Sequence, residues 1–136
     1  MVKIKVDYEG GLHTRAVHGP SSATLQTDAP VDNQGRGETF SPTDLVAGAL
    51  GSCMLTVMGI VAQRHGWGLE GASAQVEKHM VADPTRRIGR LVVDLDFPAT
   101  IPESAREILI NTANTCPVKE SLHPGIEIDL RPHWQT

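Results

Sequence analysis

The residues with the greatest chemical potential in this chain are two cysteines, Cys53 and Cys116. Cys53 lies in a stretch without charged side chains that runs from Leu45 to Gln63, where a thiol is expected to be shielded from bulk water. Cys116 directly precedes Pro117, and because proline favours the first position of a helix, Cys116 is the expected N-cap. The free amide groups of a helix N-terminus stabilise a thiolate. The two sulfurs therefore predict thiol redox chemistry.

Two simpler interpretations stay open at this point. A lone cysteine on an apolar helix is often a small buried hydrophobe, which would explain Cys53 without any chemistry. Cys116 could likewise cap its helix and have no redox role. The presence of both cysteines favours a paired role.

A buried thiolate at Cys53 needs a positive partner, because desolvation alone raises the pKa of a thiol. Arg15 and Arg36 are the candidates, although single arginines in hairpins and loops are commonly solvated. Glu38 or Asp44 could hold such an arginine in place. Asp44 already has a structural explanation as a helix-capping residue, so Glu38 is the better candidate.

A metal site is not expected. Four side chains are conceivable ligands: Cys53, His65, Cys116 and His123. The sequence has no CxxC or HxxxH pair to support such a site. The other histidines are expected on the solvated surface of strands and loops: His13, His18, His79 and His133. No local signature indicates a cysteine hydrolase, and no glycine-rich phosphate loop or other cofactor motif is present.

The composition narrows the function classes further. A formal charge of −4 argues against a basic surface that binds nucleic acid, and the sparse aromatic residues argue against a platform on which bases stack. The first residues alternate apolar and polar side chains, as a strand does and a signal peptide does not, so we expect a cytoplasmic protein. In a reducing cytoplasm a permanent disulfide is not expected. The length favours a single domain, residues 1–136.

The hydrophobic pattern predicts an α+β fold with mainly antiparallel sheet. Strands are expected at residues 2–9, 12–17 and 23–28, followed by a long polar loop at 29–40. Ser41, Pro42 and Asp44 predict the start of a helix that runs to His65. Further elements are expected at 69–82 and 91–97 (strands), from 102 and at 117–122 (helices), and at 126–131 (a final strand).

The helix at 42–65 would be roughly 36 Å long and is apolar on every side. The apolar stretch from Leu45 to Ala62 is near the lower length limit for crossing a bilayer, but burial by protein is the simpler interpretation. Small residues lie close to one stripe of this helix: Gly48, Ser52, Thr56 and Gly59. They would let another helix approach closely, so we infer a homodimer and no membrane contact.

Several short blocks resemble the OsmC/Ohr superfamily, and the resemblance extends over almost the whole chain. They are Phe40–Leu45, Gly51–Met54, Cys116–Val118 and His123-Pro124. The resemblance implies an intertwined homodimer in which sheets from both chains wrap two long central helices. It also implies a two-cysteine peroxidase for organic hydroperoxides and hydrogen peroxide, without a metal or other cofactor.

By resemblance, Cys53 would be the peroxidatic cysteine and Cys116 the resolving one. The reductant would be a dithiol, either a lipoyl protein, a small dithiol or a thioredoxin-like protein. One position departs from the family pattern: Thr43 stands where the peroxidases carry a glutamate that pairs with an arginine over the thiol. Three alternatives follow: Glu38 or Asp44 substitutes for the glutamate, the arginine is held differently, or this branch of the family has weak peroxidase activity.

Two functional hypotheses follow. The first is a thiol-dependent peroxidase that detoxifies organic hydroperoxides. The alternative is a non-catalytic OsmC-like dimer that binds a small apolar ligand or responds to redox state. Loss of both thiols on treatment with cumene hydroperoxide would distinguish them.

Overall fold

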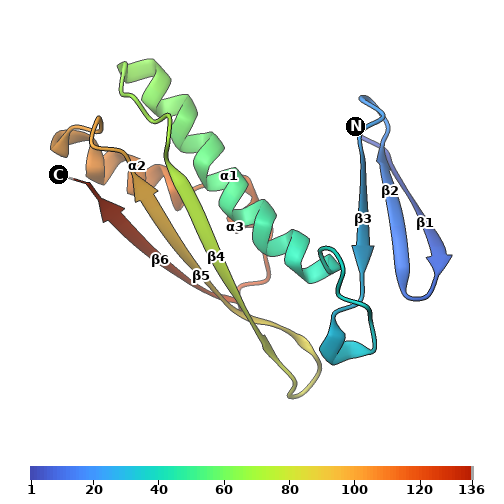
Figure 1. Ribbon diagram of the computed structural model, residues 1–136. Helices are drawn as coiled ribbons and strands as arrows, with labels where there is room; N and C mark the ends of the chain where they lie inside the picture. The colour runs from blue at the N-terminus through green and yellow to red at the C-terminus, as the bar shows by residue number, and fades with distance from the viewer. Residues whose placement is uncertain (136) are drawn as a thin grey trace. The chain divides into compact units, whose positions relative to one another are not determined.

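The computed structural model describes residues 1–135. It contains one long apolar helix, and strands in which apolar and polar side chains alternate. In chain order the elements are β1 (Ile4–Gly10), β2 (His13–His18), β3 (Thr24–Asp28), η1 (Val31–Asn33), α1 (Pro42–His65), β4 (Ser73–Val81), β5 (Arg87–Phe97), η2 (Glu103–Ala105), α2 (Arg106–Ala113), α3 (Pro117–Ser121) and β6 (Glu127–Trp134) (Figure 1). The predicted order of strands and long helices is confirmed, and so is the α+β class. The short 3-10 helices η1 and η2 are additional.

The chain divides into two compact units, residues 1–46 and the residues from Ala47 onward. The first unit contains the antiparallel sheet β1-β2-β3. Alternation along β1 places Ile4, Val6 and Tyr8 on one face of this sheet, where they are 61%, 59% and 67% exposed. The first unit thus presents an apolar sheet face that its own residues do not cover.

The predicted loop at residues 29–40 is tied to the sheet at both ends. The backbone N–H of Asp28 donates to the carbonyl of Phe40 at 3.0 Å, and that of Ala29 donates to the carbonyl of Leu12 at 3.1 Å. Inside the loop, the N–H of Gly35 donates to the carbonyl of Pro30 at 2.9 Å. These bonds give a long connection a defined path.

The start of α1 is the capping box that the sequence predicts. The backbone N–H of Ser41 donates to Asp44 Oδ2 at 2.9 Å, and the N–H of Asp44 donates to Ser41 Oγ at 3.0 Å. Pro42 takes the first helical position, where its missing N–H costs nothing. The helix ends at His65, before Gly66 with a φ of +71°.

The second unit contains the sheet β4-β5-β6. β4 and β5 pair antiparallel, as predicted, but β5 and β6 pair parallel. The chain between them contains α2 and α3, and a crossover of this kind is what parallel neighbours require. This sheet is therefore mixed. The prediction of mainly antiparallel sheet did not foresee the parallel pair.

The core of the second unit lies between this sheet and the helices. One face of β5 contributes Leu91, Val93, Leu95 and Phe97, all at most 1% exposed. Gly51 of α1 lies directly against β4, since a Cβ added there would be 3.0 Å from Val76 Cγ2. A glycine at this place lets helix and sheet approach closely.

α1 has one buried and one exposed side. The buried side carries Ala47, Leu50, Gly51, Met54, Met58 and Ala62. The opposite side carries exposed Gly48, Ala49, Ser52 and Thr56, and Ile60, which is 47% exposed. By length and composition α1 is also long and apolar enough to cross a membrane. Its exposed side is as poor in charge as its buried side.

Candidate functional site

Cys53 lies in the middle of α1, between exposed Ser52 and buried Met54. Its side chain is half-buried and is a free thiol, not part of a disulfide. The expected shielding of this thiol is therefore only partial.

Cys116 lies in the turn between α2 and α3 and is fully buried. Its Sγ accepts a hydrogen bond from the backbone N–H of Lys119 at 3.3 Å, which confirms the predicted N-cap. The expectation of a stabilised thiolate at this cysteine is wrong, however. Burial raises the pKa of Cys116, and this outweighs the opposing effect of the Lys119 and Val118 N–H groups. Cys116 is accordingly a protonated thiol at neutral pH.

The fold brings the two cysteines together from distant parts of the sequence. Cys53 lies close enough to Cys116 for its side chain to add to the rise in the pKa of Cys116, after the larger effect of burial. Both are free thiols. An accessible thiol beside a buried one is an arrangement that can pass from dithiol to disulfide and back.

Arg15, Arg36 and Glu38 belong to the first unit. Arg15 is exposed on β2, opposite Asp7 of β1 and Gln26 of β3. Contact of Arg15, Arg36 or Glu38 with a cysteine stays a prediction.

Arg36 and Glu38 lie on the loop that follows β3. The Arg36 guanidinium passes over Gly11, with Nη2 2.8 Å from the position that a Cβ would take there. The Glu38 backbone N–H donates to Asp28 Oδ2 at 3.1 Å. The Thr43 hydroxyl lies 3.2 Å from Ser41 Oγ.

One polar cluster was missed by the sequence analysis. His13, expected on the solvated surface, is half-buried with Nδ1 2.6 Å from Asp28 Oδ1. Asp28 is 3% exposed. The hydrogen bond between them raises the pKa of His13 and lowers that of Asp28. Only the pairing register of β2 and β3, which places these residues opposite each other, could have indicated this contact.

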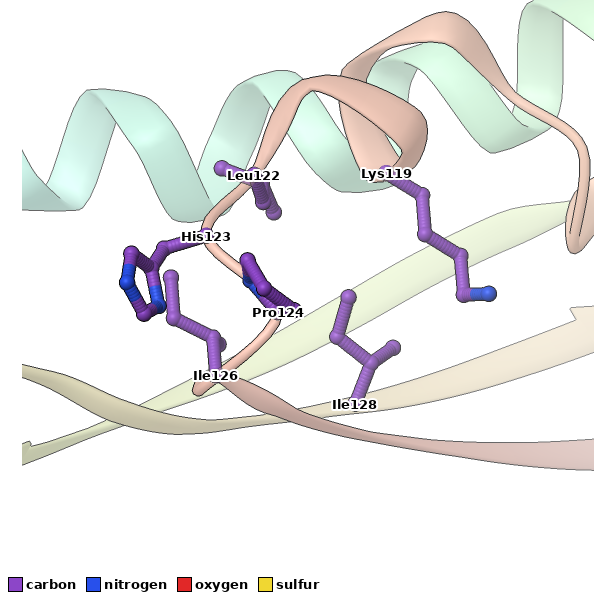
Figure 2. A pocket seen from close by; sticks show the side chains of 6 residues that line it. All are labelled: Lys119, Leu122, His123, Pro124, Ile126 and Ile128. Carbon is purple, nitrogen blue, oxygen red and sulfur yellow. The ribbon is translucent and has the colours of Figure 1, made fainter.

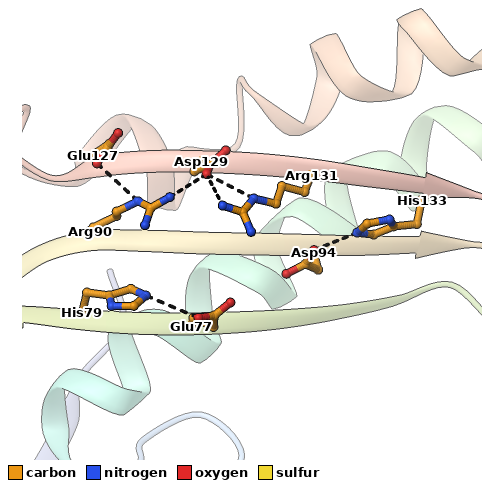
Figure 3. Close-up of polar contacts among 8 residues, drawn as sticks. All are labelled: Glu77, His79, Arg90, Asp94, Glu127, Asp129, Arg131 and His133. Carbon is orange, nitrogen blue, oxygen red and sulfur yellow. Dashed lines mark hydrogen bonds and ion pairs between the residues drawn. The ribbon is translucent and has the colours of Figure 1, made fainter.

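The outer face of the second sheet is charged (Figure 3). Arg90 and Arg131 both donate to Asp129 Oδ2, at 2.8 and 2.9 Å, and His133 lies 2.7 Å from Asp94. Within residues 1–135, no group of three or more His, Cys, Asp or Glu side chains could hold a metal ion. This face carries ion pairs within β6 and between β5 and β6.

A pocket of about 260 Å³ lies between α3 and the start of β6 (Figure 2). Its lining consists of Lys119, Leu122, His123, Pro124, Ile126 and Ile128. Neither cysteine is part of it. The Lys119 ammonium, which points into this region, also donates to the carbonyl of Asn114 at 3.4 Å.

Comparison with known proteins agrees with these features. A family model described as OsmC-like protein matches residues 35–131. The chain belongs to this family. It is 46% identical to a solved protein from Psychrobacter arcticus 273-4, provisionally named an osmotic stress induced and detoxification response protein. The match covers 98% of this chain and 96% of that one, with a TM-score of 0.92.

More distant OsmC/Ohr structures share the fold. An organic hydroperoxide resistance protein OsmC from Legionella pneumophila is 18% identical, with a TM-score of 0.78 and coverage of 97% of this chain and 96% of that one. The organic hydroperoxide resistance protein OhrB of Bacillus subtilis is 17% identical, with a TM-score of 0.70 and coverage of 98% of both chains. Among curated proteins nothing matches the sequence. The predicted OsmC/Ohr membership and fold are thus confirmed.

Proposed function

We propose that this OsmC-like protein is a thiol-dependent peroxidase that reduces organic hydroperoxides. The observation that carries the proposal is the contact between Cys53, which is half-buried, and Cys116, which is fully buried. Because a peroxide must reach the sulfur that it oxidises, Cys53 is the attacking residue and Cys116 the resolving one. Membership of the OsmC-like family, and the names of two hydroperoxide resistance proteins that share the fold, support the reaction with hydroperoxides.

The reaction has three steps. The Cys53 thiolate attacks the terminal oxygen of the hydroperoxide, the O–O bond breaks, and the alkoxide takes a proton and leaves as an alcohol. Cys116 then attacks the sulfur of the Cys53 sulfenic acid, an S–S bond forms and water leaves. Finally a dithiol reductant returns both sulfurs to thiols and becomes a disulfide itself.

The environment of Cys116 suits the second step. Its raised pKa keeps it protonated while Cys53 reacts, so the two thiols do not compete for peroxide. The Lys119 N–H remains at 3.3 Å to stabilise the thiolate that attacks.

We further propose that the active form is a cytoplasmic homodimer in which Arg15 or Arg36 activates Cys53 and Glu38 orients the arginine. The exposed apolar side of α1 and the exposed apolar face of β1 support the dimer, since a monomer would leave both in water. A reducing compartment would keep both cysteines as thiols in the resting state.

The test uses the two cysteine variants, and it is clean because the chain has no other cysteine. Reduced wild-type protein should lose both thiols to one equivalent of cumene hydroperoxide, far faster than free cysteine does. Cys53→Ser should keep its remaining thiol. Cys116→Ser should consume one equivalent and stop as a Cys53 sulfenic acid, which dimedone labels and mass spectrometry detects.

Full reactivity in Cys53→Ser would overturn the assignment of roles. Unchanged thiols in the wild-type protein would refute the peroxidase itself. That second result would favour the alternative, a dimer that binds a small ligand without turnover.

A further inference from the structure

The pocket between α3 and the start of β6 has no part in the chemistry proposed above. Its volume is about 260 Å³, and all the residues that line it belong to the second unit. Neither Cys53 nor Cys116 is among them. A cavity of about 150 Å³ is enough to hold benzene, so the volume of this pocket suits a ligand of roughly ten non-hydrogen atoms. The pocket therefore has the size that a small organic molecule needs.

One side of the pocket is apolar. Ile126, directly before β6, and Ile128 of β6 point the same way, as residues two apart along a strand do (Figure 2). Leu122 and Pro124, from the turn that follows α3, complete this side. Leu122, Ile126 and Ile128 are all half-buried. This side of the pocket can accept the hydrocarbon part of a ligand and remove it from water.

The opposite character comes from Lys119, which brings a positive charge to the pocket. Figure 2 shows its side chain reaching from α3 toward Ile128. An ammonium group has three hydrogens to donate. Within residues 1–135 this one has a single hydrogen-bond partner, the carbonyl of Asn114 at 3.4 Å. Lys119 therefore has donors to spare for a ligand.

His123 adds a further donor, and its tautomer follows from its contacts. The backbone N–H of Gly125 donates to His123 Nδ1 at 2.8 Å, so this nitrogen is an acceptor and carries no hydrogen. The neutral ring therefore has its hydrogen on Nε2. A Cβ on Gly125 would be 2.9 Å from Nδ1, so glycine is what allows the ring and the backbone to meet.

The lining contains no negative charge to neutralise Lys119. Among the described residues that line the pocket, none is acidic. Glu127 lies between Ile126 and Ile128 in the sequence and so belongs to the other face of the strand, where its carboxylate is 3.3 Å from Arg90 Nε (Figure 3). Glu120 of α3 is exposed and does not line the pocket. The side chains at the pocket thus offer donors and a positive charge beside an apolar surface.

We propose that this pocket binds a small organic monocarboxylate, with the carboxylate at the Lys119 ammonium and a short hydrocarbon chain against Ile126 and Ile128. A charge-assisted hydrogen bond from Lys119 favours a carboxylate over a neutral acceptor. An inorganic anion fits less well, because it has no hydrocarbon to cover the apolar side. The site is additional to the proposed peroxidase reaction and does not depend on it.

The first experiment titrates hexanoate into the reduced wild-type protein and follows the backbone amide signals of Leu122, Gly125 and Ile126 by NMR. These signals should shift and saturate with a dissociation constant of about 1 mM or lower, as a good ligand of this size allows. Butanoate should bind about 15-fold more weakly, because each CH₂ removed from the apolar side costs about fourfold. Hexan-1-ol, with the same chain and no charge, should bind about tenfold more weakly than hexanoate.

The second experiment uses Lys119→Met, which removes the charge but keeps the aliphatic stem and the backbone N–H that bonds to Cys116. Hexanoate should bind at least about tenfold more weakly to this variant, whereas hexan-1-ol should bind as it does to the wild-type protein. The matched control is Lys5→Met, which makes the same change of charge at an exposed residue of β1 that does not line the pocket. It should bind hexanoate as the wild-type protein does.

Several outcomes would overturn the proposal. Equal affinities of the wild-type protein for hexanoate and hexan-1-ol would show that the pocket does not recognise a carboxylate, and this comparison needs no variant to fold. Equal affinities for hexanoate and butanoate, or equal losses in Lys119→Met and Lys5→Met, would reduce the effect to attraction of an anion by net charge. No saturable shift up to about 10 mM hexanoate would mean that the site does not exist. Because no peroxide is used, the outcome is independent of whether the protein is a peroxidase.

Discussion

Replacing Gly48 by leucine tests whether the exposed side of α1 meets a second chain. In the structure a Cβ added at Gly48 has no atom within 4 Å, so the fold of the protomer has room for a larger side chain. Without a partner, Gly48→Leu should stabilise the protein by roughly 0.5–1 kcal/mol, because leucine is a much better helix former than glycine. With a partner helix packed on the small residues, the same change overpacks the interface.

The two outcomes differ in sign and in size. Overpacking costs about 1–3 kcal/mol at each site, and a two-fold dimer contains the site twice. The dimer should therefore be weakened by about 2–6 kcal/mol, which is roughly 30-fold to 20,000-fold in its dissociation constant. Sedimentation velocity over a concentration series from nanomolar to micromolar measures this directly.

Asn111→Leu on α2 is the matched control. Asn111 is exposed on α2 and not on α1, so its replacement adds an exposed leucine and improves helix propensity outside the stripe of small residues on α1. It should sediment as the wild-type protein does. If Gly48→Leu also sediments as wild type and unfolds at higher urea concentration, the reasoning about a packed helix contact is refuted.

Two further predictions concern stability. Met54→Ala should lower the free energy of unfolding, measured in urea, by about 2–5 kcal/mol, because Met54 is 0% exposed. Ile108→Ala is the control and should change this free energy by less than about 1 kcal/mol, because Ile108 is 43% exposed. Equal losses in the two variants would contradict the described core. Bonds from Arg131 and then Arg90 lower the pKa of Asp129 from 3.8, so its stabilisation is present above that pH and is lost as pH falls through the lowered value. Urea midpoints of Asp129→Asn should accordingly fall less steeply with acid than those of wild type, and parallel curves would argue against these ion pairs.

The elements of the fold that the sequence predicts best are those with strong local signals. α1 runs from Pro42 to His65, as expected, because a capping box and an uninterrupted apolar stretch define it without help from the rest of the chain. β4 alternates as predicted. The parallel pairing of β5 and β6 was not predicted, because register between strands separated by two helices depends on long-range packing.

In the candidate site, too, features set by local sequence are predicted and features set by long-range packing are not. The positions of both cysteines on a helix and at a helix N-cap follow from local sequence, and the structure has them there. The protonation state of Cys116 does not follow, because the depth of burial that raises its pKa comes from tertiary packing. His13 and Asp28 were missed for a similar reason, since only the hairpin register makes them neighbours.

The bond from the Lys119 N–H to Cys116 Sγ has a consequence for how this protein can change over evolutionary time. Serine is among the best N-cap residues, so a single-nucleotide drift from cysteine to serine at position 116 would leave α3 as well capped as before. Selection for a stable fold would not remove such a variant. Only selection on the proposed peroxidase chemistry would keep sulfur at this position, so that chemistry could be lost while the architecture is kept.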